Sequence, residues 1–195
     1  MTETTGNRRQ QILEVLASEL EAKPTSRLTT ASLARAVGVT EAALYRHFPS
    51  KRKMFEALID FAEESVFTLT NRILADNRDP LVRCEQVMRT LLVFAERNPG
   101  ITRILIGDAL SGESERLQKR VLNFFDRLET QLKQVLREAN LGDGPRSKPS
   151  IAAAANLMMA VAEGRMSRFV RSGFSASVTA HWSEQWEALK GALFT

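Results

Sequence analysis

The chain has 195 residues, of which 44% are hydrophobic and 26% are charged, with a formal net charge of +4; this composition is that of a globular protein large enough for one or two cores. No stretch approaches about 18 uninterrupted apolar residues, so we expect no transmembrane helix and no membrane partner, and the polar start MTETTGNRRQQ lacks an apolar signal segment, which favours a cytoplasmic location. Cys84 is the only cysteine, which excludes an internal disulfide and a cysteine-rich metal site.

The first expected helix covers about residues 7–22 and ends before Pro24. Its apolar residues recur with the period of an amphipathic helix. They are Ile12, Leu13, Val15, Leu16 and Leu20.

Residues 29–48, TTASLARAVGVTEAALYRHF, are predicted to form two short helices joined by a tight turn. The first helix begins near Thr29 or Thr30, and Thr40 can cap the second, over 41–48. Gly38 supplies the left-handed turn residue that a side chain with a Cβ would resist. One face of each helix is apolar and is expected to be buried: Leu33, Ala34 and Val37 in the first, Leu44 and Phe48 in the second.

The other face of the second helix is a surface of small, aromatic and basic groups. Its members are Ala42, Ala43, Tyr45, Arg46 and His47. A helix-turn-helix places such a surface in the DNA major groove, with the second helix as the reader. The alternative is a helical hairpin with a purely structural role.

The residues that follow favour the DNA interpretation. Pro49 ends the second helix, and the next helix opens with Lys51, Arg52 and Lys53, although cations at a helix N-terminus oppose the macrodipole. A phosphate backbone would stabilise them there; the alternative is a solvated charge run. The first 55 residues carry nine lysines and arginines against five acids, so the whole net charge of +4 lies in this segment.

Helical periodicity continues to the end of the chain, which predicts an all-α fold. The expected helices cover about 50–75, from about 79 to the break at Asn98-Pro99-Gly100, then 101–110, 113–139, 150–172 and 180–193. Residues 142–150, GDGPRSKPS, are a loop by composition. We expect an N-terminal three-helix domain with the helix-turn-helix over 1–53, and a helical bundle for dimerisation and partner binding over 54–195.

The last two helices carry more apolar faces than one monomer easily buries. Residues 151–166 are rich in alanine and methionine, and the final helix repeats Trp182, Trp186, Leu189 and Leu193. We expect a homodimer through a four-helix bundle, with Met158 and Trp186 at its interface; the alternative is burial within the monomer. A dimer places two reader helices about 34 Å apart, which fits a palindromic double-stranded DNA site.

Catalytic machinery is not apparent. The two histidines, His47 and His181, lie far apart in sequence, and no HExxH, GxSxG or P-loop motif occurs. We therefore expect no enzyme activity, no catalytic residue, no metal and no cofactor.

The run TTASLARAVGVTEAALYRHFPSKRKMFEALI resembles the DNA-binding domain of TetR-type regulators. Four strings, NRRQQIL, VTEAALYRHFPSK, FAERNPGITRIL and RFVRSGF, are similar to one group of that family, the nucleoid occlusion factors. The resemblance implies a nucleoid-associated, dimeric DNA-binding protein that antagonises the tubulin-like division protein FtsZ by binding its C-terminal tail.

The same resemblance implies which residues contact DNA. Residues 40–47 would read the sequence, and phosphates would be held by Thr29, Tyr45, His47, Lys51 and Arg52. The complete expected set is Thr29, Thr30, Thr40, Ala42, Ala43, Tyr45, Arg46, His47, Lys51 and Arg52.

Two classes of regulator compete for the C-terminal domain. A ligand-responsive transcriptional repressor would enclose a small-molecule pocket, into which Arg89, Asn123 and Glu163 could point. A division inhibitor would instead bind the acidic, apolar FtsZ tail, and Phe61, Arg97 and Asn98 could supply that groove, unless Phe61 packs in the core. The chain departs from the expected groove pattern at Leu69, Arg89, Thr90 and Val93.

Overall fold

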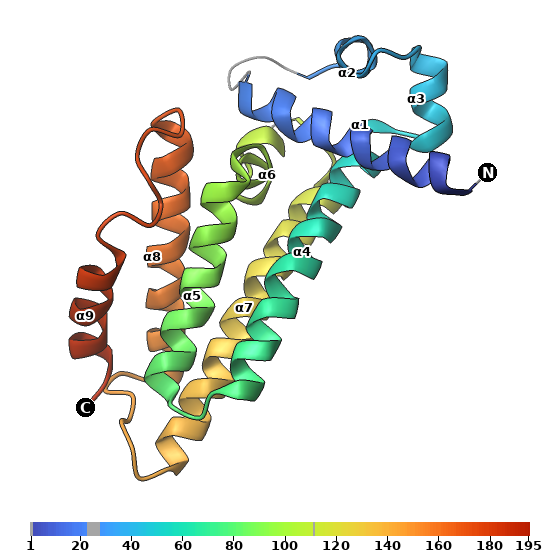
Figure 1. Ribbon diagram of the computed structural model, residues 1–195. Coiled ribbons are helices and arrows are strands. Elements are labelled where there is room, and N and C mark those ends of the chain that lie inside the picture. Colours follow the sequence, from blue (N-terminus) through green and yellow to red (C-terminus); the bar gives the residue numbers. More distant parts are fainter. Residues whose placement is uncertain (1, 23–27, 111) are drawn as a thin grey trace. The chain divides into compact units, whose positions relative to one another are not determined.

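The computed structural model describes residues 2–22, 28–110 and 112–195, with side chains from residue 7 onward (Figure 1). These residues form helices, apart from loops and one isolated antiparallel bridge between Ser147 and Phe194, which confirms the all-α fold class. The helices are α1 (Thr2–Ala22), α2 (Thr30–Val37), α3 (Glu41–His47), α4 (Lys51–Asp76), α5 (Pro80–Arg97), α6 (Pro99–Leu105), the 3₁₀ helix η1 (Asp108–Leu110), α7 (Glu115–Leu141), α8 (Ile151–Arg171) and α9 (Trp182–Leu193). Pro24, expected to end the first helix, lies outside the described residues.

The helices belong to two compact units. Unit 1 covers residues 1–62 and 98–121, and unit 2 covers residues 63–97 and 122–195. Unit 1 therefore holds α1, α2, α3, α6 and η1 with the first parts of α4 and α7. This grouping differs from the expected division between residues 53 and 54, since α6 comes later in the chain and packs against α1.

The contact between α6 and α1 in unit 1 depends on a glycine (Figure 1). An ideal Cβ on Gly100 would lie 2.0 Å from the carbonyl oxygen of Ala17, so the two helix backbones approach more closely than any side chain allows. Arg103, only 5% exposed, stabilises the same contact. Its Nη1 donates to the Leu20 carbonyl at 2.6 Å and its Nε pairs with Asp108 at 2.6 Å.

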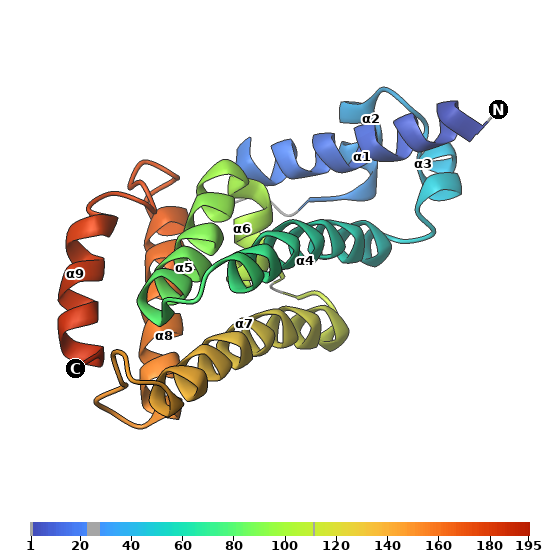
Figure 2. The same ribbon diagram turned by 60° about the horizontal axis from the view of Figure 1, so that its bottom comes forward.

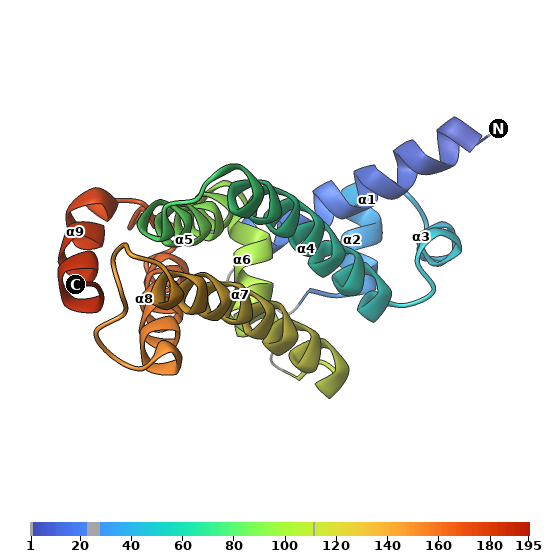
Figure 3. The ribbon, with the colours of Figure 1, turned by 90° about the horizontal axis from the view of Figure 1, so that it is seen from below.

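In unit 2, α5 packs against α8 (Figure 2), and the second halves of α4 and α7 lie side by side (Figure 3). Phe67 of α4 meets Phe124 of α7 edge to face, with ring centroids 5.5 Å apart. The indole of Trp182 at the start of α9 donates to Glu85 of α5 at 2.8 Å. Cys84 packs as a small apolar residue in this core, where burial raises the pKa of its thiol to about 12.

The expected interface residues Met158 and Trp186 lie in the core of unit 2. Met158 is 0% exposed and Trp186 is 6% exposed in the single chain. A partner subunit can therefore contact almost nothing of either side chain. Both residues fit the alternative interpretation, in which the apolar faces are buried within the monomer. The periodicity located an apolar face correctly, but it could not say whether the same chain or a second copy covers that face.

Candidate nucleic-acid interface

Local hydrogen bonds explain why residues 29–48 form a helix-turn-helix. Thr29 and Ser32 make a capping box at the start of α2, in which the Ser32 amide donates to Thr29 Oγ1 at 3.1 Å and the Thr29 amide donates to Ser32 Oγ at 3.2 Å. Gly38 ends α2 in the left-handed region, with φ of 76°. Thr40 Oγ1 then accepts from the Ala43 amide at 3.2 Å and caps α3. The two-helix prediction is confirmed.

Polar contacts fix the angle between α2 and α3. Thr30 Oγ1 donates to Glu41 Oε2 at 2.9 Å, and the Tyr45 hydroxyl donates to Thr30 Oγ1 at 3.4 Å. From α1, the Arg9 guanidinium lies 4.3 Å from the centre of the Phe48 ring, and its Nη1 donates to the His47 carbonyl at 3.2 Å. Helix α3 is thus held in place by both helices that precede it in unit 1.

These contacts leave most of the expected DNA-contacting residues accessible. Thr29, Thr40, Ala42, Tyr45, Arg46 and Arg52 are exposed, while Thr30, Ala43, His47 and Lys51 are half-buried. Tyr45 is 43% exposed although its hydroxyl is held by Thr30, so its ring stands at the surface in a defined position. A rigid, amphipathic surface of this kind is suited to the DNA major groove.

The cations that open α4 have carboxylate partners: Glu113, which is distant in sequence, and Glu56 of the same helix. Lys51 Nζ lies 2.6 Å from Glu113 Oε1, and Lys53 Nζ lies 2.7 Å from Glu56 Oε2. Arg52 Nε approaches Glu56 more loosely, at 3.7 Å, and its side chain is 47% exposed. All three cations are therefore paired with carboxylates of the protein itself.

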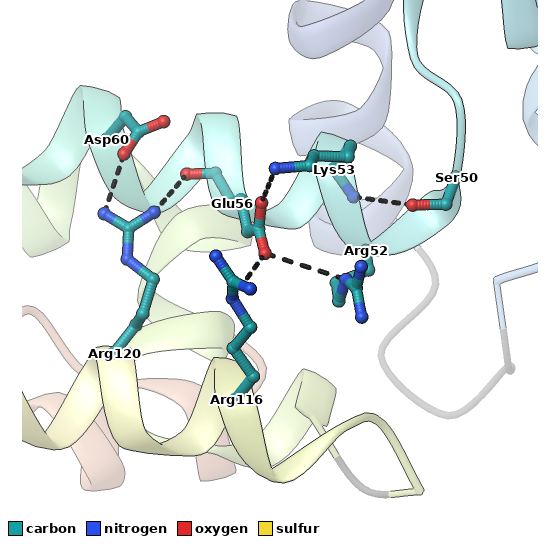
Figure 4. Close-up of polar contacts among 7 residues, drawn as sticks. All are labelled: Ser50, Arg52, Lys53, Glu56, Asp60, Arg116 and Arg120. Atoms are coloured by element: carbon teal, nitrogen blue, oxygen red, sulfur yellow. Dashed lines mark hydrogen bonds and ion pairs between the residues drawn. The ribbon is translucent and has the colours of Figure 1, made fainter.

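Glu56 is the centre of this cluster (Figure 4). It is 5% exposed, and Arg116 from α7 approaches its Oε1 at 3.3 Å. The hydrogen bond from Lys53, with the charges of Lys53, Arg116 and Arg52, holds the pKa of the Glu56 carboxyl below its ordinary value despite the opposing effect of burial. Next to it, Arg120 pairs with Asp60 at 2.7 Å. The beginnings of α4 and α7 are thus joined by ion pairs.

A second feature of unit 1 is a pocket of about 260 Å³ bounded by α1, α4 and α6. Its lining includes Leu13 and Ala17 of α1, Phe61 of α4, and Asn98 before α6. Phe61 is 45% exposed, so the alternative that it packs in the core is wrong. Arg97, the last residue of α5, is exposed and precedes Asn98 in the chain.

Residues considered for a small-molecule pocket do not converge in unit 2. Arg89, Asn123 and Glu163 are all exposed. Among the described residues, no group of three or more histidine, cysteine or acidic side chains is arranged to hold a metal ion. In the same part of the chain, no helix is long and apolar enough to cross a membrane.

Comparisons with known proteins agree on both halves of the chain. Residues 12–58 match the family "Bacterial regulatory proteins, tetR family", and residues 78–193 match "Tetracyclin repressor-like, C-terminal domain" in its SlmA-like form. Nucleoid occlusion factor SlmA of Alteromonas mediterranea is 54% identical over 184 residues, which are 94% of each chain. The protein of the same name from Colwellia psychrerythraea is 56% identical over 183 residues, 94% of this chain and 92% of that one.

Solved structures with low sequence identity share the fold. The MbdR regulator from Azoarcus sp. CIB has a TM-score of 0.81 at 16% identity, and the alignment covers 96% of this chain and all of that one. The ketosteroid regulator KstR2 of Mycobacterium tuberculosis has a TM-score of 0.77 at 18% identity, covering 96% and 95%. At these identities the likeness shows the fold alone.

Proposed function

Because this chain belongs to the TetR family of bacterial regulatory proteins, and within it to the nucleoid occlusion factors, we propose that it binds specific DNA sites and inhibits assembly of the FtsZ ring over the nucleoid. The observation that carries the DNA part is the capped helix-turn-helix with Tyr45 and Arg46 exposed on α3. The FtsZ part rests on kinship with nucleoid occlusion factors and on the pocket beside Phe61.

The proposed complex with DNA is a dimer on a palindrome. Arg46 would contact base edges, while Lys51 and Arg52 would contact phosphates. Lys51→Ala and Arg52→Ala should weaken binding to all sequences alike and lower the salt slope by about one unit per subunit, whereas Arg46→Ala should relax the preference at one base position. Salt titrations of binding to the palindrome and to random duplex distinguish the two roles.

Exposed residues of α8 are the proposed dimer surface, in place of Met158 and Trp186. Leu157 is 43% exposed, and Ala160 and Gly164 are exposed on the same helix at positions one and two turns further. Small residues at this spacing allow a second helix to approach closely, while Leu157 supplies apolar area to bury. The same face borders a cavity of about 400 Å³ between α8, the following loop and the start of α9, which a partner helix could fill.

We propose that the pocket beside Phe61 takes an apolar side chain of the FtsZ tail. Leu13, Ala17 and Phe61 supply apolar contact area, and Asn98 supplies a polar group at the rim. Arg97, adjacent in sequence to Asn98, would provide the positive charge for an acidic peptide. A half-exposed phenylalanine in a partly enclosed site is a typical anchor point for a short peptide.

A titration of labelled FtsZ C-terminal peptide, with and without the palindromic duplex, tests this proposal. Phe61→Ala and Arg97→Asp should abolish peptide binding and leave DNA binding intact, while Leu141→Ala, which alters a side chain 89% exposed on α7, should change neither. DNA should tighten peptide binding, and by linkage the peptide should tighten DNA binding equally. Release of DNA by a hydrophobic metabolite, with no peptide response, would instead identify a ligand-responsive repressor.

A further inference from the structure

The side chain of Lys51 is engaged in contacts within unit 1. Its ammonium lies 2.6 Å from the carboxylate of Glu113, and the two side chains are only 21% and 16% exposed. The same ammonium lies 5.3 Å from the centre of the Phe55 ring. Lys51 is therefore folded against the protein, in a position that both a charge and an aromatic face stabilise.

Glu113 occupies a defined place in the segment between η1 and α7. Its amide donates to the Leu110 carbonyl at 2.9 Å, and Gly112 before it has a φ of 76°, which turns the backbone sharply. The turn directs a carboxylate from a distant part of the sequence to the first residue of α4. A carboxylate in this position offers Lys51 the same kind of partner that a DNA phosphate offers.

We propose that Glu113 acts as an internal competitor of the DNA phosphate for Lys51, so that this ion pair is an autoinhibitory contact. The inference rests on the proposed function, in which Lys51 binds phosphate. DNA binding is then an exchange in which Lys51 leaves Glu113 and contacts the backbone. Each subunit gives up one partly buried ion pair in this exchange, which lowers the affinity for DNA.

The other cations at this helix start differ from Lys51 in how firmly they are held. Arg52 and Lys53 share the single carboxylate of Glu56 with Arg116, and both have side chains almost half exposed, at 47% and 46%. Either can turn toward a phosphate while Glu56 keeps its contact with Arg116. Glu113 is therefore the acid whose removal should most affect DNA binding.

The test measures binding of the palindromic duplex by fluorescence anisotropy over a range of salt concentrations. Glu113→Gln keeps the shape of the side chain and removes its charge. It should tighten binding about five-fold per subunit, the factor for an ion pair worth about 1 kcal/mol. Glu115→Gln is the matched control, because it makes the same charge change two residues away at a side chain 87% exposed. It should shift affinity less than about two-fold.

A double-mutant cycle isolates the pair. In a Lys51→Ala background, Glu113→Gln should no longer tighten binding, since the cation for which the acid competes is absent. The competitor role is refuted if Glu113→Gln changes DNA affinity no more than Glu115→Gln does, or lowers it. The phosphate contact still stands in that case, provided that Lys51→Ala lowers DNA affinity. If Lys51→Ala changes neither affinity nor salt slope, the phosphate contact itself fails, and the competitor role fails with it. Thermal melts of each variant establish that affinities are compared between folded proteins.

Discussion

Gly100→Ala should destabilise the protein, although alanine normally favours a helix. The added Cβ would lie 2.0 Å from the Ala17 carbonyl oxygen, 2.9 Å from its carbonyl carbon and 3.2 Å from the Leu20 Cβ. The two nearest atoms belong to the backbone of α1, so no side-chain rotation relieves the overlap. The α6 backbone has to move by more than an ångström relative to α1, or the contact opens.

The magnitude follows from two opposing effects. Overpacking of a close contact costs about 1–3 kcal/mol, while replacing a helical glycine with alanine returns about 0.5–1 kcal/mol. The return should lie at the lower end, because Gly100 stands in the first turn of α6. The net loss is about 1–2 kcal/mol, which corresponds to a decrease in Tm of about 2–8 °C for a chain of this size.

Thermal unfolding followed by circular dichroism, at one protein concentration, measures this effect. Gly191→Ala is the control, since Gly191 also lies within a helix, α9, but an added Cβ there meets no atom within 4 Å. The control should raise Tm by a few degrees at most. A Gly100→Ala variant as stable as the parent chain, beside a stabilised control, would refute the close approach of α6 and α1.

Two further predictions concern the proposed interface and the buried carboxylate. Leu157→Glu on α8 should give monomers in sedimentation equilibrium and should weaken binding to the palindrome. Leu122→Glu, at a side chain 60% exposed on α7, should leave the dimer intact. If the Leu157→Glu variant is still a dimer, the interface lies elsewhere. Glu56→Gln should cost about 1–3 kcal/mol in the free energy of unfolding at neutral pH, because the hydrogen bond from Lys53 and the attraction to Arg116 are charge-assisted. The pKa of Glu56 is lowered in the folded protein, so the stabilisation by its charge is present above the ordinary carboxyl pKa and is lost as pH falls through the folded value. Urea unfolding should therefore show that the free energies of unfolding of the parent chain and of Glu56→Gln differ at neutral pH and converge at acidic pH. A difference that stays constant with pH would contradict this role of Glu56.

The helix-turn-helix could be predicted from the sequence because its determinants are local. Thr29, Gly38 and Thr40 act on neighbours within a few residues, and each was found in its expected place. Helix ends were less certain. The expected helix over 101–110 is α6 from Pro99 followed by η1, because proline suits a first turn and Gly107, with a φ of 81°, interrupts the segment.

The long-range ion pairs of α4 could not be predicted from the sequence, whereas Arg52 and Lys53 pair with Glu56 at the i,i+4 and i,i+3 spacings of a single helix. Lys51 and Glu113 are 62 positions apart, and Glu56 and Arg116 are 60 apart, so no local pattern connects them. An apolar stripe likewise does not reveal what covers it. Met158 and Trp186 face the core of unit 2, while Leu157, one position from Met158, faces outward.

Sedimentation of FtsZ polymers with GTP tests most directly whether the DNA-bound protein prevents FtsZ assembly. With the palindromic duplex present, the protein should reduce the FtsZ that pellets, and the same amount of protein with random duplex should reduce it less. Phe61→Ala, with DNA binding unchanged, should restore pelleting to the level of FtsZ alone. If the protein and its palindrome together leave the amount of pelleted FtsZ unchanged, at concentrations where the duplex is fully bound, the protein does not inhibit FtsZ assembly in the proposed way.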